Sequence, residues 1–185
     1  MITAPPDAIA SWARAGVARL PAVLPDGLAA ELLMGLRRLP LAIVETAHET
    51  VWAYDVRVPP VRDPQLFEPL FRLVPILDEV VPRLASEVCG RGLVAHAPTT
   101  FRVVAYRKGA WTDGAADASP GMVVATIALS TETWPDAWGG WPADGGTAAG
   151  ALTLADAARP RAVPVLTRHV ERYELRTLLA PEAAP

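Results

Sequence analysis

The first candidate chemistry of this chain lies in a loop between two apolar, strand-like runs. The loop GAWTDGAADASPG, residues 109–121, follows FRVVAYRK and precedes MVVATIALS, and it contains two aspartates and no histidine. Loops on a rigid scaffold often hold catalytic or metal-binding side chains. Asp113 lies in a TDG turn sequence, whereas Asp117 could act as a general acid or base if apolar surroundings raise its pKa. The alternative for Asp117 is a solvent-facing loop position.

Arginines on two predicted strands form a second group of candidates. Alternation along the last strand places Arg172, Glu174 and Arg176 on the same face. Such a polar face lies either in a pocket or in solvent. We expect Arg172 to point into a pocket, with an outward position on an edge strand, paired with Glu171 or Glu174, as the alternative. Arg102 is a further pocket candidate, with a surface ion pair as its alternative. The ordinary pKa of histidine, near ~6.5, suits His169 to proton transfer, with a solvated strand end as the alternative.

Four tryptophans lie in or beside the loops that flank these strands. Trp111 belongs to the aspartate loop, and the other three lie in the glycine-rich segment 134–150. Dense glycine indicates turns or a mobile lid, and aromatic rings can form a wall against a ring-bearing substrate. Trp111 and Trp138 are therefore predicted to contact substrate, with the pinning of a long loop as the structural alternative.

Helical spacing dominates the first half of the chain. The segment DGLAAELLMGLRRLP has a capping Asp26 and leucines at the three-to-four spacing of one helical face. The run 63–89 has the same spacing, but Pro69, Pro75 and Pro82 divide it into two helices or one kinked helix. Between these helices, ETVWAYDVRVPP alternates with a period of two, which predicts a strand that ends at the double proline.

Strand-like segments separated by turns make up the chain after Gly92. They are GLVAHAPTTFRVVAYRKG, MVVATIALSTETW, ALTLADAA, RAVPVLTR and HVERYELRTLLAP. Helices come first and antiparallel strands follow, so the predicted fold class is α+β, mainly β. We expect a single domain over residues 1–185, with a helical support over about 1–90 and a β core over about 91–180.

The composition excludes several classes of protein. Seventeen basic and 20 acidic residues give a net charge of −3, and neither sign forms a run, so we expect no nucleic-acid or membrane partner. A single cysteine, Cys89, excludes an intrachain disulfide and a thiolate metal cluster. With no signal-peptide pattern and no apolar stretch near ~20 residues, a soluble, cytoplasmic protein is predicted.

The order of these pieces resembles that of the non-haem iron, 2-oxoglutarate-dependent oxygenases, in particular the small prolyl-4-hydroxylase-like group, over about residues 20–180. In that family a strand with a tyrosine and then a glycine precedes a His-x-Asp ligand pair, and here Tyr106 and Gly109 precede the aspartate loop. The strand that begins Arg172-Tyr-Glu-Leu matches the family's arginine-bearing strand. The resemblance implies a double-stranded β-helix, or cupin-like jelly roll, with the N-terminal helices packed on one sheet.

Both metal-ligand histidines of the family are missing at the matching positions. The loop reads Ala115-Ala116-Asp117 where the family has His-x-Asp, and Pro160 stands at the place of the distal histidine. Iron(II) in these enzymes is held by two imidazoles and one carboxylate. The chain has three histidines, and we do not expect two of them to converge on Asp117. No metal ligand and no cofactor is therefore predicted, with Fe(II) and 2-oxoglutarate as the alternative.

The resemblance also implies that Arg172 anchors a ligand carboxylate, assisted by the hydroxyl of Tyr106. We therefore predict a metal-independent enzyme that performs cyclisation, isomerisation, elimination or ring opening on a small, carboxylate-bearing molecule of natural product biosynthesis. The predicted catalytic residues are Asp117, Arg172 and Tyr106, and the predicted substrate-binding residues are Arg102, Trp111, Trp138 and His169. A working Fe(II)/2-oxoglutarate hydroxylase or halogenase and a non-catalytic small-molecule-binding module are the alternatives. No oligomeric state is predicted.

Overall fold

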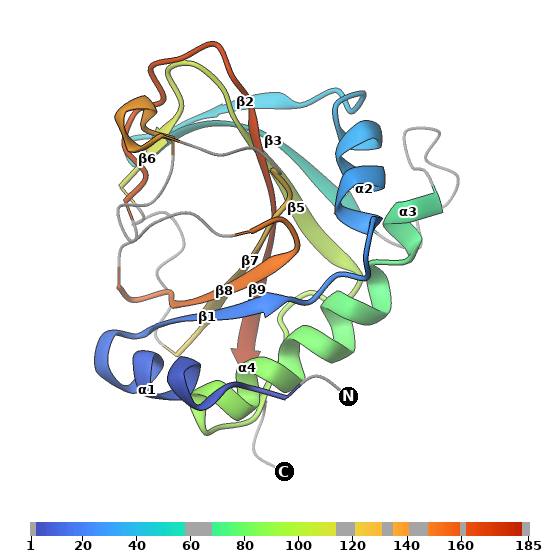
Figure 1. The fold of residues 1–185 in the computed structure, drawn as a ribbon, viewed down its shortest axis with the longest axis vertical. Coiled ribbons are helices and arrows are strands. Elements are labelled where there is room, and N and C mark those ends of the chain that lie inside the picture. The colour runs from blue at the N-terminus through green and yellow to red at the C-terminus, as the bar shows by residue number, and fades with distance from the viewer. Residues whose placement is uncertain are drawn as a thin grey trace.

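One antiparallel sheet organises the chain in a computed structural model. The described residues are 3–57, 68–113, 121–130, 135–140, 148–159 and 162–182. The strands are β1 (Val17–Ala22), β2 (Ala42–Glu45), β3 (Glu49–Arg57), β4 (Leu93–Ala95), β5 (Thr100–Tyr106), β6 (Trp111–Thr112), β7 (Val123–Ala128), β8 (Ala151–Asp156) and β9 (Arg172–Pro181). They form a nine-stranded sheet in the order β1-β8-β7-β9-β5-β3-β2, with β4 added to β9 and β6 added to β3. The sheet curls so that β2 and β3 lie across from β1 and β8 (Figure 1).

The helices pack along one side of this curled sheet (Figure 1). They are α1 (Pro6–Ala15), α2 (Leu28–Leu36), α3 (Glu68–Phe71), the π-helical turn η1 (Ile76–Val80) and α4 (Val81–Cys89). The 3-10 turn η2 (Asp136–Trp138) lies away from them, beside β6 (Figure 1). The break at η1 confirms that the proline-rich run is not one regular helix. Gly90 ends α4 in the left-handed conformation, with φ 67°, where glycine has no Cβ penalty.

Alternation along the central strands gives the sheet two different faces. On the outer face, Phe101 and Val103 of β5 and Leu175 of β9 belong to the large apolar core shared with the helices, which includes Leu84 of α4. On the inner face, Val104 of β5 belongs to a smaller cluster. The inner face of β9 carries charged side chains, because its residues alternate between the two sides. The predicted α+β, mainly β class is confirmed.

A turn after β7 lies directly on the segment that leads to β9. Trp138 packs with Val163 of the inner cluster, and its carbonyl accepts a hydrogen bond from the Thr167 amide at 2.8 Å. Gly140 donates to the Pro164 carbonyl at 2.7 Å. At Gly139, with φ 66°, a Cβ would collide with the backbone carbonyl of the facing segment. The two connections are therefore in backbone contact.

Several predicted elements differ from the structure. Besides the predicted strand β3, two strands from the first 57 residues, β1 and β2, join the sheet. The segment RAVPVLTR does not form a strand: Val163 makes one isolated bridge with Thr112, and Pro164, which has no N–H, cannot extend it. Asp26 does not cap α2, whose N-cap is Gly27 without a side-chain hydrogen bond. Within the described ranges, no helix has the length and apolar character needed to cross a membrane.

The fold predicts that one buried and one exposed position contribute very differently to the free energy of unfolding. Leu84 is fully buried between α4 and the sheet, whereas Met34 of α2 is 64% exposed. Replacing Leu84 with alanine should lower the free energy of unfolding by roughly 2–5 kcal/mol because it leaves a cavity. Met34→Ala should change it by less than about 0.5 kcal/mol. Urea titrations followed by circular dichroism measure both; equal losses would contradict the described core.

Candidate functional site

Five polar side chains meet on the inner face of the sheet. They are Glu49 of β3, Tyr106 of β5, and Arg172, Glu174 and Arg176 of β9, here called the inner polar cluster. Cross-strand register places Tyr106 of β5 beside Arg172 of β9, and Glu174 and Arg176 follow on the same face of β9. Buried charges are costly unless they are paired. This group of buried polar side chains is therefore a candidate functional site.

Glu174 lies at the centre of this cluster. Its Oε2 is 2.9 Å from Nη1 of Arg172, and its Oε1 is 3.0 Å from Nη2 of Arg176. The same Nη2 donates to the hydroxyl of Tyr106 at 3.1 Å, and that hydroxyl donates to Glu174 Oε1 over a long 3.5 Å. One carboxylate thus connects both guanidiniums and the phenol.

Arg172 also stacks on Tyr106. Its guanidinium carbon lies 4.1 Å from the centroid of the Tyr106 ring, within the range of a cation–π interaction. The exposed fractions are 3% for Arg172, 1% for Tyr106 and 4% for Glu174. Arg172 is buried, as expected for an inward position, and it also pairs with Glu174, the partner expected for the alternative.

Glu49 is a member of the cluster that sequence reasoning missed. It is 3% exposed, and its Oε2 accepts no hydrogen bond from the part of the chain that the structure describes. The nearest cation to this oxygen is Nη1 of Arg176, at 3.7 Å. The alternation of ETVWAYDVR places Glu49 on the same side as the buried Val51, and this pattern could have identified it.

Burial and neighbouring charges shift the pKa values of Tyr106 and Arg176. Burial raises the pKa of Tyr106 above its ordinary value, and the nearby Glu174 raises it further. Tyr106 therefore keeps its proton at neutral pH and serves as a donor. Burial acts to lower the pKa of Arg176, but Tyr106, Glu174 and Glu49 together raise that pKa above its ordinary value. Arg176 stays charged.

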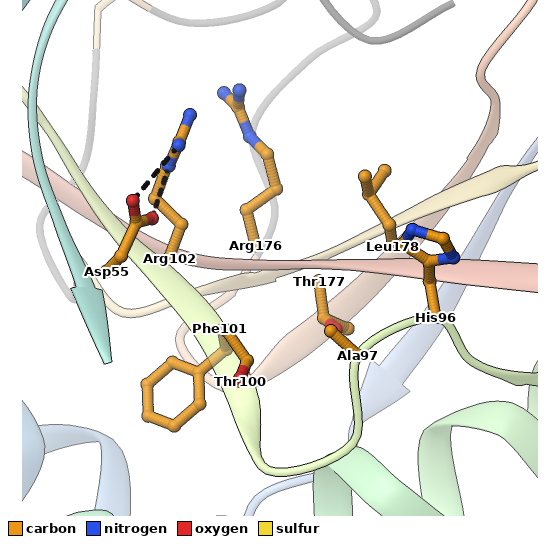
Figure 2. A pocket seen from close by; sticks show the side chains of 9 residues that line it. All are labelled: Asp55, His96, Ala97, Thr100, Phe101, Arg102, Arg176, Thr177 and Leu178. Atoms are coloured by element: carbon orange, nitrogen blue, oxygen red, sulfur yellow. Dashed lines mark hydrogen bonds and ion pairs between the residues drawn. The ribbon is translucent and has the colours of Figure 1, made fainter. Parts of the chain in front are cut away.

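A cavity of about 160 Å³ adjoins the inner polar cluster, because Arg176 lines the cavity and also belongs to the cluster. Its lining consists of Asp55, His96, Ala97, Thr100, Phe101, Arg102, Arg176, Thr177 and Leu178. Figure 2 shows Arg102 and Arg176 extending to the same side from neighbouring strands. Arg102 forms two hydrogen bonds with Asp55, at 2.7 and 3.2 Å. Arg102 thus has both the pocket position and the surface ion pair that the sequence suggested.

The other predicted site residues that the structure describes lie outside the cluster. Trp111 is half-buried on β6, and Trp138 packs beside the inner apolar cluster. His169 is exposed, 3.2 Å from the amine of Lys108. Asp117, like Pro160, lies outside the described residues.

Cys89 is the one thiol of the chain, and its surroundings disfavour a catalytic role. Burial raises the pKa of Cys89 to about 11, with Arg91 acting in the opposite direction. A thiol acts as a nucleophile through its thiolate form. Cys89 therefore stays protonated at neutral pH.

Solved structures share this architecture. No protein-family model and no curated protein matches the chain. A prolyl-4-hydroxylase from Pseudomonas putida aligns with a TM-score of 0.67 and 19% identity, covering 96% of this chain and 98% of that one. The chain has the fold of the Fe(II)/2-oxoglutarate-dependent oxygenases. The predicted jelly roll and the resemblance are thereby confirmed at the level of the fold.

Two further neighbours of this oxygenase fold come from antibiotic chemistry. The non-haem α-ketoglutarate-dependent epimerase SnoN of nogalamycin biosynthesis aligns with a TM-score of 0.66 and 18% identity, covering 95% of this chain and 81% of that one. HygX from Streptomyces hygroscopicus, with nickel, 2-oxoglutarate and hygromycin B bound, aligns with a TM-score of 0.63 and 14% identity, covering 96% and 87%. SnoN is also known in complex with Fe3+ and α-ketoglutarate.

These neighbours contradict the prediction that the protein takes no cofactor. The fold carries a metal ion together with 2-oxoglutarate in HygX and in SnoN, so missing histidines at two aligned positions did not justify that prediction. The inference failed because it assumed that the ligands must stand at the family's sequence positions.

The described residues do not by themselves form a binding site for a metal ion or for 2-oxoglutarate. Among them, no three His, Cys, Asp or Glu side chains gather as metal ligands. The three histidines lie apart: His48 Nδ1 bonds Asp113 at 2.8 Å, His96 lines the cavity, and His169 lies by Lys108. Arg172, the implied carboxylate anchor, is already in contact with Glu174. We therefore derive no chemical step through either group.

The shifted pKa of Tyr106 predicts a loss of stability in alkaline solution. Because its pKa is raised in the folded state, the contribution is fully present below the unfolded pKa, near ~10, and is lost as pH rises through the folded value. Tyr106→Phe should weaken this decline and should cost about 1–2 kcal/mol at pH 7 through the lost hydrogen bonds.

Urea unfolding at pH 7 and at about pH 10.5 measures the effect of Tyr106→Phe. A Cys89→Ala background removes the thiol, whose raised pKa would otherwise contribute in the same range. An identical pH dependence with and without the phenol would contradict the assigned burial of Tyr106.

Proposed function

We propose that this protein is an enzyme that performs non-oxidative acid–base chemistry on a small molecule bound at the inner face of its sheet. The observation that carries the proposal is the inner polar cluster, two arginines and two glutamates buried around a tyrosine on the inner face of the sheet. Buried groups with perturbed pKa values concentrate at functional sites. The adjoining cavity gives a ligand access to one member, Arg176.

The cluster suggests a division of work among its residues. Tyr106, protonated and only weakly bonded to Glu174 at 3.5 Å, can donate its hydrogen to a substrate oxygen. Preorganised donors of this kind stabilise negative charge that develops in a reaction. Arg172 positions Glu174 and lies over the Tyr106 ring, so we assign it a positioning role. Asp117 remains our candidate for the group that accepts or returns the proton, on the basis of its place in the loop.

The cavity suggests where the substrate lies. Arg102 is half-buried at its edge and pairs with Asp55, whose side chain is 59% exposed. Exposed ion pairs contribute little stability, so a carboxylate of the ligand can compete for this guanidinium. A carboxylate-bearing molecule would therefore place its anion toward Arg102 and its reacting part toward Tyr106. Trp111, Trp138 and His169 stay as predicted contacts around the rest of the molecule.

An Fe(II)/2-oxoglutarate-dependent oxygenase is the second candidate function. It is favoured by neighbours of the same fold that hold a metal ion and 2-oxoglutarate. In that case the ligands would include residues outside the described ranges, of which Asp117 is the matched carboxylate.

Oxygen and co-substrate dependence separates the two candidates. The purified protein would be incubated with small-molecule extracts of the source cells and followed by untargeted mass spectrometry, with and without O2 and 2-oxoglutarate. The first proposal expects a product that is isomeric with its substrate, or differs from it by an eliminated or added water, formed without O2. Conversion that requires both O2 and 2-oxoglutarate, with release of succinate, would overturn it in favour of the second.

The proposed role of Asp117 can be tested in the same assay. Asp117→Asn should lower turnover by about 10²–10⁴-fold, the usual contribution of a general acid or base. Asp113→Asn is the matched control, because Asp113 lies in the same loop and pairs with His48. Full turnover by Asp117→Asn, or equal losses in both variants, would contradict the assignment.

A further inference from the structure

The turn between β4 and β5 forms one wall of the cavity that adjoins the inner polar cluster. Both strands pair with β9 along the same edge, and they leave Thr177 and Leu178 of β9 between their two pairings. The amide of His96 donates to the Leu178 carbonyl at 2.9 Å. Figure 2 shows these two β9 residues with His96 and Ala97 of the turn beside them. The cavity thus lies where residues 96–99 leave the edge of β9, and the conformation of this turn sets the shape of the wall.

The turn holds one residue in a backbone conformation that its side chain disfavours. Thr99 has φ 61°, and it is the one non-glycine residue of the described chain with a positive φ. The amide of Thr100 donates to the Ala97 carbonyl at 3.0 Å, which closes a turn with Pro98 and Thr99 at its centre. This order, proline followed by a positive φ, is that of a type II turn, which usually has glycine or asparagine at the second position. A β-branched residue there is strained, and such strain persists only where surrounding contacts compensate for it.

Asp78 supplies a compensating contact from the helical side of the sheet. The amide of Thr99 donates to the Asp78 carboxylate, and both carboxylate oxygens lie 3.0 Å from the nitrogen. Asp78 belongs to the π-helical turn η1 and is flanked by Leu77 and Val81, which are buried in the large apolar core. Hydrogen bonds to a charged acceptor are stronger than those between neutral groups. A carboxylate on a well-packed segment therefore holds Thr99 in its left-handed conformation.

The strained turn adjoins the place that the proposed function gives to the ligand. Arg102, to which that function assigns the ligand carboxylate, lines the same cavity as the turn residues His96 and Thr100. An imidazole and a hydroxyl can each donate or accept a hydrogen bond. Strained backbone is concentrated at active sites and at segments that clamp ligands. The turn is therefore placed to contact the part of the ligand that lies next to its carboxylate.

We propose that Asp78 is a positioning residue, which holds the turn 96–99 so that His96 and Thr100 form a ligand-contacting wall of the cavity. This wall binds a hydroxyl or carbonyl group of the ligand whose carboxylate lies at Arg102. The ligand part of this inference rests on the proposed function. The hold of Asp78 on the turn does not, and it can be tested without a substrate.

Amide hydrogen exchange, followed by NMR, tests the hold of Asp78 on the turn. Asp78→Ala removes the acceptor of the Thr99 amide, whose exchange should become at least about 10-fold faster, the effect of losing one hydrogen bond to a charged group. Asp78→Asn keeps a neutral oxygen and should show a smaller increase, and it replaces the alanine variant if that variant does not fold. Glu79→Ala is the matched control, because Glu79 is the next residue of η1 and is exposed. Unchanged exchange of the Thr99 amide in the Asp78 variants, or an equal increase in Glu79→Ala, would overturn the proposal.

Thr99→Gly provides a rescue that distinguishes positioning from a general loss of stability. In the turnover assay of the proposed function, Asp78→Ala should raise KM by about 10-fold with a smaller change in kcat, as expected for a binding contact. Adding Thr99→Gly should return KM to near the wild-type value, because glycine adopts a positive φ without a Cβ penalty. An unchanged KM in Asp78→Ala, or no return with Thr99→Gly, would overturn the ligand part. Absence of non-oxidative turnover by the wild type would instead contradict the proposed function, and the exchange of the Thr99 amide would still decide the role of Asp78.

Discussion

The contact of one carboxylate with two guanidiniums allows a charged face to exist inside this sheet. Arg172 and Arg176 lie four residues apart on the same face of β9, and Glu174 lies between them. Because burial of a charge is less costly when the charge is paired, this contact stabilises β9 between β5 and β7. The ring of Tyr106 covers the guanidinium of Arg172, and its hydroxyl accepts a hydrogen bond from Arg176, so Tyr106 contacts both guanidiniums.

The two faces of the sheet differ in role: the outer face stabilises the fold through apolar packing, and the inner face carries the charged side chains. The outer face provides the large apolar core with the helices, and residues such as Val103 and Leu175 serve it. The inner face has a much smaller apolar cluster and carries the charges. Since adjacent residues of β9 point to opposite faces, a change at Glu174 alters the inner cluster while Leu175 continues to hold the strand on the core. A change on the inner face therefore alters the charged cluster directly, while the outer-face contacts of β9 with the core stay in place.

The sequence predicted the parts of this structure that depend on local pattern. Alternation placed Arg172, Glu174 and Arg176 on one face, and the order of motifs identified the jelly roll. It did not predict β1 or β2, because these strands are short and gain their hydrogen bonds from β8 and β3. The pairing of Arg172 with Glu174 was one of the alternatives that the sequence left open. The contact of this group with Tyr106 was missed, since it depends on register between β5 and β9, about 70 residues apart in the chain.

The contact between Gly139 and the segment that leads to β9 has a mechanical consequence. Trp138 and Gly140 hold this segment through backbone hydrogen bonds on both sides of the glycine, with Thr167 and Pro164 as partners. A glycine at their centre permits a separation of the two backbones that no other residue would allow. Residues 135–140 and 164–167 are therefore held to each other, so a displacement of the first segment would be transmitted to the second and along the chain toward Arg172, at the first position of β9.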